Sequence, residues 1–172
     1  MMIVVDKQKV EEHLESSTKE AIEKVQDQYT VRKAPEKRNL EACLTAYTKN
    51  QLLELSEDND FDAKKSWKKA KLVDYIEESI LSSIEIQFIA LGEENLTLLK
   101  QMVDEEVNVE ELTADEADDY AAVYTEAVNR GLLYTAEEEN QLIFMMPDEI
   151  KKQLAINLPH FNHLKREYQF RL

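Results

Sequence analysis

A lysine-rich stretch at residues 64–71 is the segment whose residue types and spacing best suit a chemical task. Its sequence is Lys-Lys-Ser-Trp-Lys-Lys-Ala-Lys, and these residues include five of the six basic side chains between positions 39 and 80. Ser66 is a favourable N-cap, so a helix is expected to begin here, and the free amides of a helix N-terminus attract phosphate. Trp67 can stack on a base or a sugar, or it can fill a small core. The stretch therefore predicts either a phosphate-binding turn or a solvated charged turn above a buried tryptophan.

The acidic run from Asp58 to Asp62 has the composition of a calcium-binding loop but not its spacing. An EF-hand loop that began at Asp58 would need glycine at its sixth position and a bidentate glutamate at its twelfth. This chain has Ala63 and Lys69 at those positions, and a lysine does not ligate calcium. We expect a polar connection between two helices instead.

Two histidines near the end of the chain could ligate a metal ion. His160, His163 and Glu167 lie three and four positions apart, so they share one face if the segment is helical. They supply three ligands at most, and Pro159 disturbs the helix start. We therefore expect no metal site there, and we expect Cys43 to pack as a small apolar residue.

Known catalytic motifs are missing from the sequence. There is no glycine-rich phosphate loop, no zinc-type cysteine spacing and no nucleophile elbow. Carboxylates are abundant, but abundance does not make a catalytic pair. We expect a protein that is not an enzyme and that needs no cofactor.

The elements that position these residues are predicted to be helices. Only two glycines and three prolines occur in 172 residues, too few for the turns of an all-β fold, and a hydrophobic fraction of 43% is enough for a core. Apolar spacing and capping signals predict helices at residues 6–28, from 48 to between 56 and 60, from 66 to about 91, at 93–103, 113–130, from 147 to 158 and at 161–171. The first of these either packs on one side against the protein or pairs with a partner.

Local signals also predict where several elements begin and end. Thr48 with Gln51, and Thr113 with Glu116, form capping boxes, and Gly131 is placed to stop a helix. The apolar runs between positions 132 and 146 flank a polar tip at 135–141 and predict a hairpin, the only β-structure expected. Five apolar residues are expected to share one small core: Leu52, Leu55, Leu72, Val73 and Ile76.

Charge is unevenly distributed along the chain, whose formal net charge is −15. Residues 1–38 have eight basic and eight acidic side chains, residues 39–80 have six and nine, and residues 81–172 have seven and nineteen. A negative field repels phosphate, so a nucleic-acid surface has to be local and is least expected in the C-terminal half. The nine carboxylates at residues 104–119 form either a solvated connection or a surface that mimics DNA or binds cations.

The sequence gives weaker information on location. No apolar run approaches the roughly 18 residues of a membrane span, and the N-terminus lacks the basic flank of a signal peptide. One cysteine cannot form an intrachain disulfide, so no oxidising compartment is required. We expect a cytoplasmic protein without a membrane partner.

Residues 44–80 resemble the SAP-type helix–extension–helix module, a fold shared with LEM domains and the N-terminal module of the Rho terminator. The resemblance rests on residues 48–55, Thr-Lys-Asn-Gln-Leu-Leu-Glu-Leu, and on residues 65–76, Lys-Ser-Trp-Lys-Lys-Ala-Lys-Leu-Val-Asp-Tyr-Ile. Many members bind nucleic acid through basic residues near the turn, whereas LEM-type relatives bind protein. Carried over by position, Lys65, Lys68, Lys69 and Lys71 would contact phosphates. With Lys64 and Trp67 from the same stretch, they are the expected nucleic-acid-binding residues. The extension departs from the family, because it has Asp62-Ala63 and Trp67 where glycine is usual.

Residues 93–156 resemble a winged helix in the order helix, helix, hairpin, helix. The resemblance rests on residues 129–134, Asn-Arg-Gly-Leu-Leu-Tyr, and residues 144–150, Phe-Met-Met-Pro-Asp-Glu-Ile. In DNA-binding members the helix before the hairpin enters the major groove. Here that helix has five acidic residues (Asp115, Glu116, Asp118, Asp119 and Glu126), and Arg130 is its only basic residue. Acids that face phosphate are repulsive, so this half is expected to dock a protein rather than DNA.

Together these features predict a mainly α protein with one short β-hairpin and three segments. Residues 1–38 form an N-terminal helix and linker, 39–91 a SAP/Rho-N-like module, and 92–172 an acidic winged-helix-like domain. The predicted function is a non-enzymatic nucleic-acid-associated accessory or regulatory protein, whose basic turn contacts phosphates while its acidic half docks a protein. The alternative is a pure protein-interaction module without nucleic-acid binding. The oligomeric state is left open.

Overall fold

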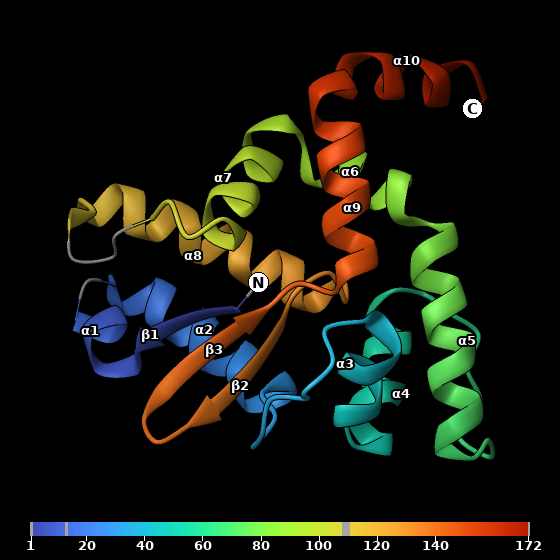
Figure 1. Cartoon of the computed structure of the whole chain (residues 1–172), viewed down its shortest axis with the longest axis horizontal. Helices are drawn as coiled ribbons and strands as arrows, with labels where there is room; N and C mark the ends of the chain where they lie inside the picture. Colours follow the sequence, from blue (N-terminus) through green and yellow to red (C-terminus); the bar gives the residue numbers. More distant parts are fainter. Residues whose placement is uncertain (1, 13, 108–110, 172) are drawn as a thin grey trace.

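Short-range signals determine several helix ends in the computed structural model, which describes residues 2–12, 14–107 and 111–171 (Figure 1). The Gln51 amide donates to Thr48 Oγ1 at 3.1 Å, and the Thr48 amide donates to Gln51 Oε1 at 2.9 Å. The same exchange joins Thr113 and Glu116, at 3.2 and 2.9 Å. Both predicted capping boxes are therefore confirmed.

Helices dominate, as the sequence predicts. The elements in chain order are β1 (Met2–Asp6), α1 (Lys7–Glu12), α2 (Ser16–Tyr29), α3 (Leu40–Ala46), α4 (Lys49–Asp58), α5 (Lys69–Ser82), α6 (Ile84–Leu91), α7 (Glu93–Val103), α8 (Ala114–Asn129), β2 (Tyr134–Glu138), β3 (Gln141–Met145), α9 (Asp148–Asn157), the 3-10 turn η2 (Leu158–His160) and α10 (Phe161–Arg171). The mainly α class with a short hairpin is confirmed. Within the described ranges, no helix is long and apolar enough to cross a membrane.

The prediction of a single helix at residues 6–28 is wrong. Its first part is divided between strand β1 and the short helix α1, and α2 begins only at Ser16. Strand β1 pairs antiparallel with β3, from Met2 opposite Met145 to Asp6 opposite Gln141, which gives a three-stranded sheet of order β1-β3-β2. The hairpin is therefore not the only β-structure. Its partner strand lies at the other end of the sequence, beyond the reach of a local pattern.

The hairpin itself is present with longer strands and a tighter tip than expected. Strands β2 and β3 pair up to Glu138 opposite Gln141, so only Glu139 and Asn140 form the turn. Both have positive φ, 50° and 62°, as a type I′ turn requires. Glu137 and Glu138, expected at a polar tip, are strand residues instead.

The helix expected from Ser66 to about Leu91 is shorter at its start and broken in the middle. Lys68, not Ser66, is the N-cap of α5. At the break, Ser83 Oγ donates to the Ser79 carbonyl at 2.7 Å, and Ser82 Oγ donates to the same carbonyl at 3.2 Å. Serine hydroxyls that bond to the preceding turn often bend helices. The chain therefore changes direction between α5 and α6.

One core cluster contains all five predicted core residues, and it is much larger than the small core expected. It includes Tyr29 from the first predicted segment, Leu72 from the second and Leu132 from the third. At its centre the rings of Tyr29 and Tyr47 lie 5.7 Å apart, and those of Tyr47 and Tyr134 lie 5.2 Å apart. The three-segment division stays a prediction about the sequence.

Several acidic groups in this core are expected to make the protein sensitive to alkali. Burial raises the pKa of the Cys43 thiol and of Tyr124 to about 12, and it raises the pKa values of Tyr29, Tyr47 and Tyr134 well above the ordinary range of a phenol. These groups ionise more readily in the unfolded protein than in the folded protein. Their contribution to stability is therefore complete below the unfolded-state pKa and is lost as the pH rises above it. Unfolded thiols and phenols ionise near roughly 8.5 and 10. We expect the free energy of unfolding to fall steadily above about pH 9.

Chemical denaturation at a series of pH values measures this loss directly. Tyrosinate absorbance provides the comparison, because the four buried tyrosines should ionise only as the protein unfolds. Ionisation of all tyrosines near pH 10 with the fold intact would contradict the expectation.

Candidate nucleic-acid interface

Three lysines of the turn between α4 and α5 have free ammonium groups. Lys64, Lys65 and Lys68 are exposed, and their side chains make no hydrogen bond or ion pair with any described residue. Lys68 is also the N-cap of α5, where no side chain caps the helix. Cations therefore stand beside the amides of the first turn, an arrangement that suits a phosphate.

The two remaining lysines of the stretch are engaged within the protein. Lys69 Nζ donates to the Thr45 carbonyl at 2.7 Å, and Lys71 Nζ lies 4.3 Å from the centre of the Trp67 ring. An exposed cation–π contact contributes only about 0.5–1 kcal/mol, so Lys71 can be released at small cost. Lys69 keeps its charge at the surface while it ties α5 to α3.

Trp67 packs inside the turn. Its ring meets Tyr75 edge-on, with ring centres 5.1 Å apart, and it is half-buried against the core. Tyr75 is fixed in turn, because its hydroxyl accepts a hydrogen bond from the Asp62 amide at 3.0 Å. These contacts favour the packing alternative for Trp67, and a stacking role stays a prediction.

The acidic run before the turn connects helices, as expected. Helix α4 ends at Asp58, whose Oδ2 accepts hydrogen bonds from the Tyr29 hydroxyl at 2.5 Å and the Gln28 amide group at 3.2 Å. Asp60 then takes a positive φ of 56° and turns the chain. Asp58 thus fastens the helix–extension–helix segment to α2.

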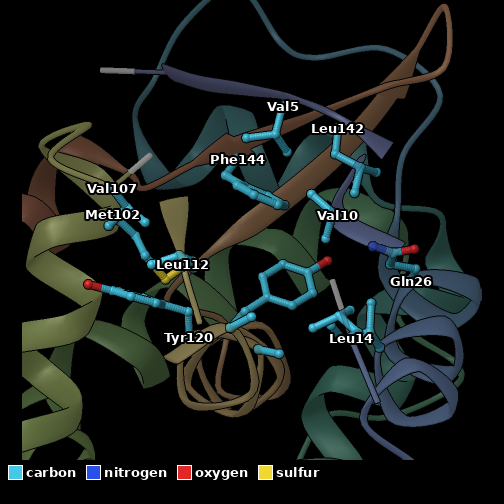
Figure 2. Close-up of a pocket in the computed structure, with 14 residues that line it drawn as sticks. Val5, Val10, Leu14, Gln26, Met102, Val107, Leu112, Tyr120, Leu142 and Phe144 are labelled. Carbon is cyan, nitrogen blue, oxygen red and sulfur yellow. The ribbon is translucent and has the colours of Figure 1, made fainter. Parts of the chain in front are cut away.

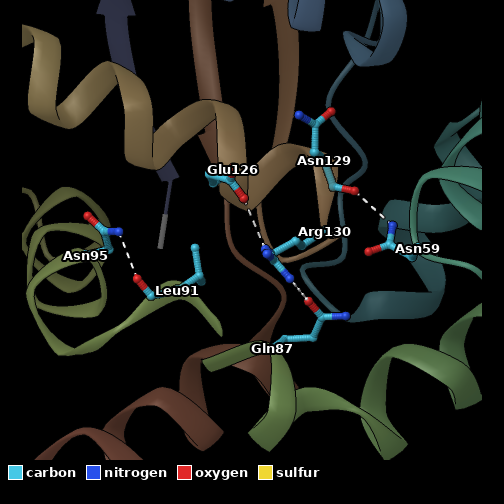
Figure 3. A network of polar contacts seen from close by, with 7 residues as sticks. All are labelled: Asn59, Gln87, Leu91, Asn95, Glu126, Asn129 and Arg130. Carbon is cyan, nitrogen blue, oxygen red and sulfur yellow. Dashed lines mark hydrogen bonds and ion pairs between the residues drawn. The ribbon is translucent and has the colours of Figure 1, made fainter. Parts of the chain in front are cut away.

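A polar network joins the same segment to the end of α8 (Figure 3). Asn59 Nδ2 donates at 2.8 Å both to the Leu55 carbonyl and to the Asn129 carbonyl. Arg130 donates to Glu126 Oε2 from Nε at 3.2 Å and to Gln87 Oε1 from Nη1. Arg130 is therefore engaged with Glu126 and Gln87, and it is not free to contact a phosphate.

The acids of the C-terminal half are divided between structural and exposed roles. Glu137 pairs with Lys7 at 3.1 Å, and Glu138 Oε1 accepts from the Ala34 amide at 2.8 Å. On α8, Asp115, Glu116, Asp119 and Glu126 are exposed. Among the described residues from the start of α7 to the end of α8, Lys100 is the only lysine or arginine, and it pairs with Asp104. Glu93 and Glu94 of α7 are exposed as well, so acids outnumber cations on the exposed sides of these two helices, which we call the α7–α8 face.

The expected absence of a metal site stays a prediction. His163 Nε2 lies 3.5 Å from Glu167 Oε1, and both His160 and His163 are exposed. No group of three or more His, Cys, Asp or Glu side chains that could hold a metal ion occurs among the described residues. Cys43 is buried, as predicted for a small apolar residue.

An apolar cavity of about 80 Å³ lies between the sheet, α2, α7 and α8 (Figure 2). Val5, Leu142 and Phe144 line its sheet side. The Tyr120 hydroxyl donates to Gln101 Oε1 at 2.7 Å, and the Tyr124 hydroxyl lies 2.7 Å from Thr135 Oγ1. Since these hydroxyls are already hydrogen-bonded, the cavity offers mainly apolar contact.

The described residues thus form a mainly helical protein with an exposed lysine turn, a negative α7–α8 face and one apolar cavity. Comparison of the chain with protein-family models, with curated proteins and with solved structures found no match. The resemblances to SAP-type and winged-helix modules therefore rest on the residues quoted above and stay predictions.

Proposed function

We propose that this chain is a cytoplasmic, non-enzymatic, nucleic-acid-associated accessory or regulatory protein. Its lysine turn contacts phosphates, and its negative α7–α8 face docks a protein. The cytoplasmic location rests on the single cysteine, which requires no oxidising compartment. The SAP-type resemblance of residues 44–80 supports the choice of ligand.

One observation supports the nucleic-acid part most strongly. Lys64, Lys65 and Lys68 project from one turn without an internal partner among the described residues, although the protein has a net charge of −15. Uncommitted cations beside an uncapped helix start suit an external anion better than an internal one.

A salt-dependent titration of the full chain tests this proposal. Fluorescent duplex DNA, single-stranded DNA and RNA oligonucleotides are titrated at several salt concentrations. Three or four phosphate contacts should weaken duplex binding roughly 40- to 150-fold between about 50 and 200 mM salt. No binding to any of the three at low salt would contradict the proposal.

The second candidate is a pure protein-interaction module, and the α7–α8 face favours it. Lys100 and Arg130 are paired with Asp104 and Glu126, so neither is available to neutralise the remaining exposed acids of this face. A basic partner protein would complement such a surface. The acidic face of this chain would then compete with nucleic acid for the partner's binding site. The two candidates differ in one measurement: only the first binds nucleic acid without another protein present.

A further inference from the structure

The linker at residues 30–39 is anchored to the fold rather than loose. The Val31 amide donates to the Thr135 carbonyl at 2.9 Å, beside strand β2, and the Ala34 amide donates to Glu138. At the other end the Leu40 amide donates to Glu149 Oε2 at 2.6 Å. The backbone of the linker therefore follows a defined path along the protein.

This linker and α3 form an open groove of about 580 Å³. Lys33 and Lys37 line it from the linker, and Thr45 lines it from the end of α3. Both lysines are exposed, and neither pairs with a described residue. The groove thus presents two more uncommitted cations.

The groove is continuous with the lysine turn. Thr45 belongs to the groove, and its carbonyl oxygen is the acceptor of Lys69 Nζ at 2.7 Å. Lys69 follows Lys68, so these two cations lie at the Thr45 end of the groove, whose linker side has Lys33 and Lys37. These residues are separated by some thirty positions in sequence and meet only in the folded chain.

Two acidic side chains reduce the positive charge of the groove. Glu36 and Glu41 are exposed and line it together with Lys33 and Lys37. With Lys69 at the rim, cations exceed acids by one. No aromatic side chain is among the residues that line the groove, so base stacking is not available there.

We propose that the groove extends the phosphate-binding surface of the lysine turn. A nucleic-acid backbone passes from Lys68 over Lys69 to Lys33 and Lys37, which contact successive phosphates without reading bases. The inference rests on the proposed function, because it names a second part of the same binding surface. It predicts that affinity depends on the linker and is independent of base sequence.

The test compares two double variants that change the net charge equally. The linker variant is Lys33→Gln/Lys37→Gln, and the α10 variant is Lys165→Gln/Arg166→Gln, which removes two exposed cations elsewhere. The linker variant should reduce the salt slope by about 1.8 on duplex DNA or about 1.4 on a single strand. Its affinity at about 50 mM salt should fall roughly tenfold. The α10 variant should bind like the unchanged protein, and Glu36→Gln should bind more tightly.

Each outcome decides the inference. Unchanged binding by the linker variant, alongside loss of binding when the lysine turn is altered, would overturn the groove and leave the proposed function intact. Loss of binding in both double variants to the same extent would show a general charge effect and would also overturn the groove. If the unchanged protein binds none of the oligonucleotides, the inference and the proposed function fail together. Circular dichroism of each variant shows whether the fold is retained.

Discussion

Replacing Lys64, Lys65 and Lys68 with glutamate is expected to lower nucleic-acid affinity on the order of 100-fold at about 50 mM salt. The three ammonium groups are exposed and unpaired with described residues, so the change removes phosphate contacts and adds repulsion. The salt slope on duplex DNA should fall by about 2.7, which is the share of three contacts. Fluorescence anisotropy at four or more salt concentrations measures both quantities.

Stability should be nearly unaffected by this triple change. Trp67, Tyr75 and the contact between Lys69 and Thr45 are untouched, and an acid at position 68 suits the start of α5. The matched control is Lys152→Glu/Lys165→Glu/Arg166→Glu, which makes the same charge change at three exposed positions elsewhere. Equal losses in the two variants would mean that net charge, not the lysine turn, governs binding.

Replacing Gly131 with alanine is expected to lower the free energy of unfolding by about 2–4 kcal/mol. Gly131 follows α8 with φ of +73°, and its amide and that of Leu132 donate to the Val128 and Ala127 carbonyls. This is a Schellman ending, in which the left-handed residue is normally glycine. An added Cβ would also lie 2.7 Å from Ile80 Cδ1, so the buried Ile80 side chain must shift.

A double-mutant cycle separates the two causes of that loss. Ile80→Val removes the Cδ1 atom and should by itself cost about 0.5–1.5 kcal/mol. In the Ile80→Val background, Gly131→Ala should cost only the backbone strain, about 1–2 kcal/mol. Additive effects in urea denaturation would show that the contact between positions 131 and 80 does not contribute.

The helix ends and the buried faces of the helices could be predicted because their signals lie within a few residues of one another. Thr48 and Thr113 each find their capping partner three positions later, and Gly131 ends α8 through hydrogen bonds within five positions. Leu52, Leu55 and Ile76 are buried as their apolar spacing predicts. Each of these outcomes depends on backbone geometry that the neighbouring residues specify.

The candidate site was predictable in composition but not in arrangement. The sequence shows five lysines in one stretch, yet it does not show that Lys69 bonds to Thr45 or that Lys71 lies over Trp67. It also gives no sign that Lys33 and Lys37 belong beside the turn. Surface side chains take their positions from whatever the fold places next to them.

The sequence by itself determined the mainly helical class, the capping boxes, the hairpin and the excess of acids over cations along α8. Only the tertiary structure decided that Met2–Asp6 is a strand, because its hydrogen bonds go to Gln141–Met145 at the far end of the chain. It likewise decided that Arg130 is occupied, because Gln87 approaches it from α6. Such pairings are stabilised by contacts between segments that are distant in sequence. A local sequence pattern reflects only the contacts among neighbouring residues, so it does not predict them.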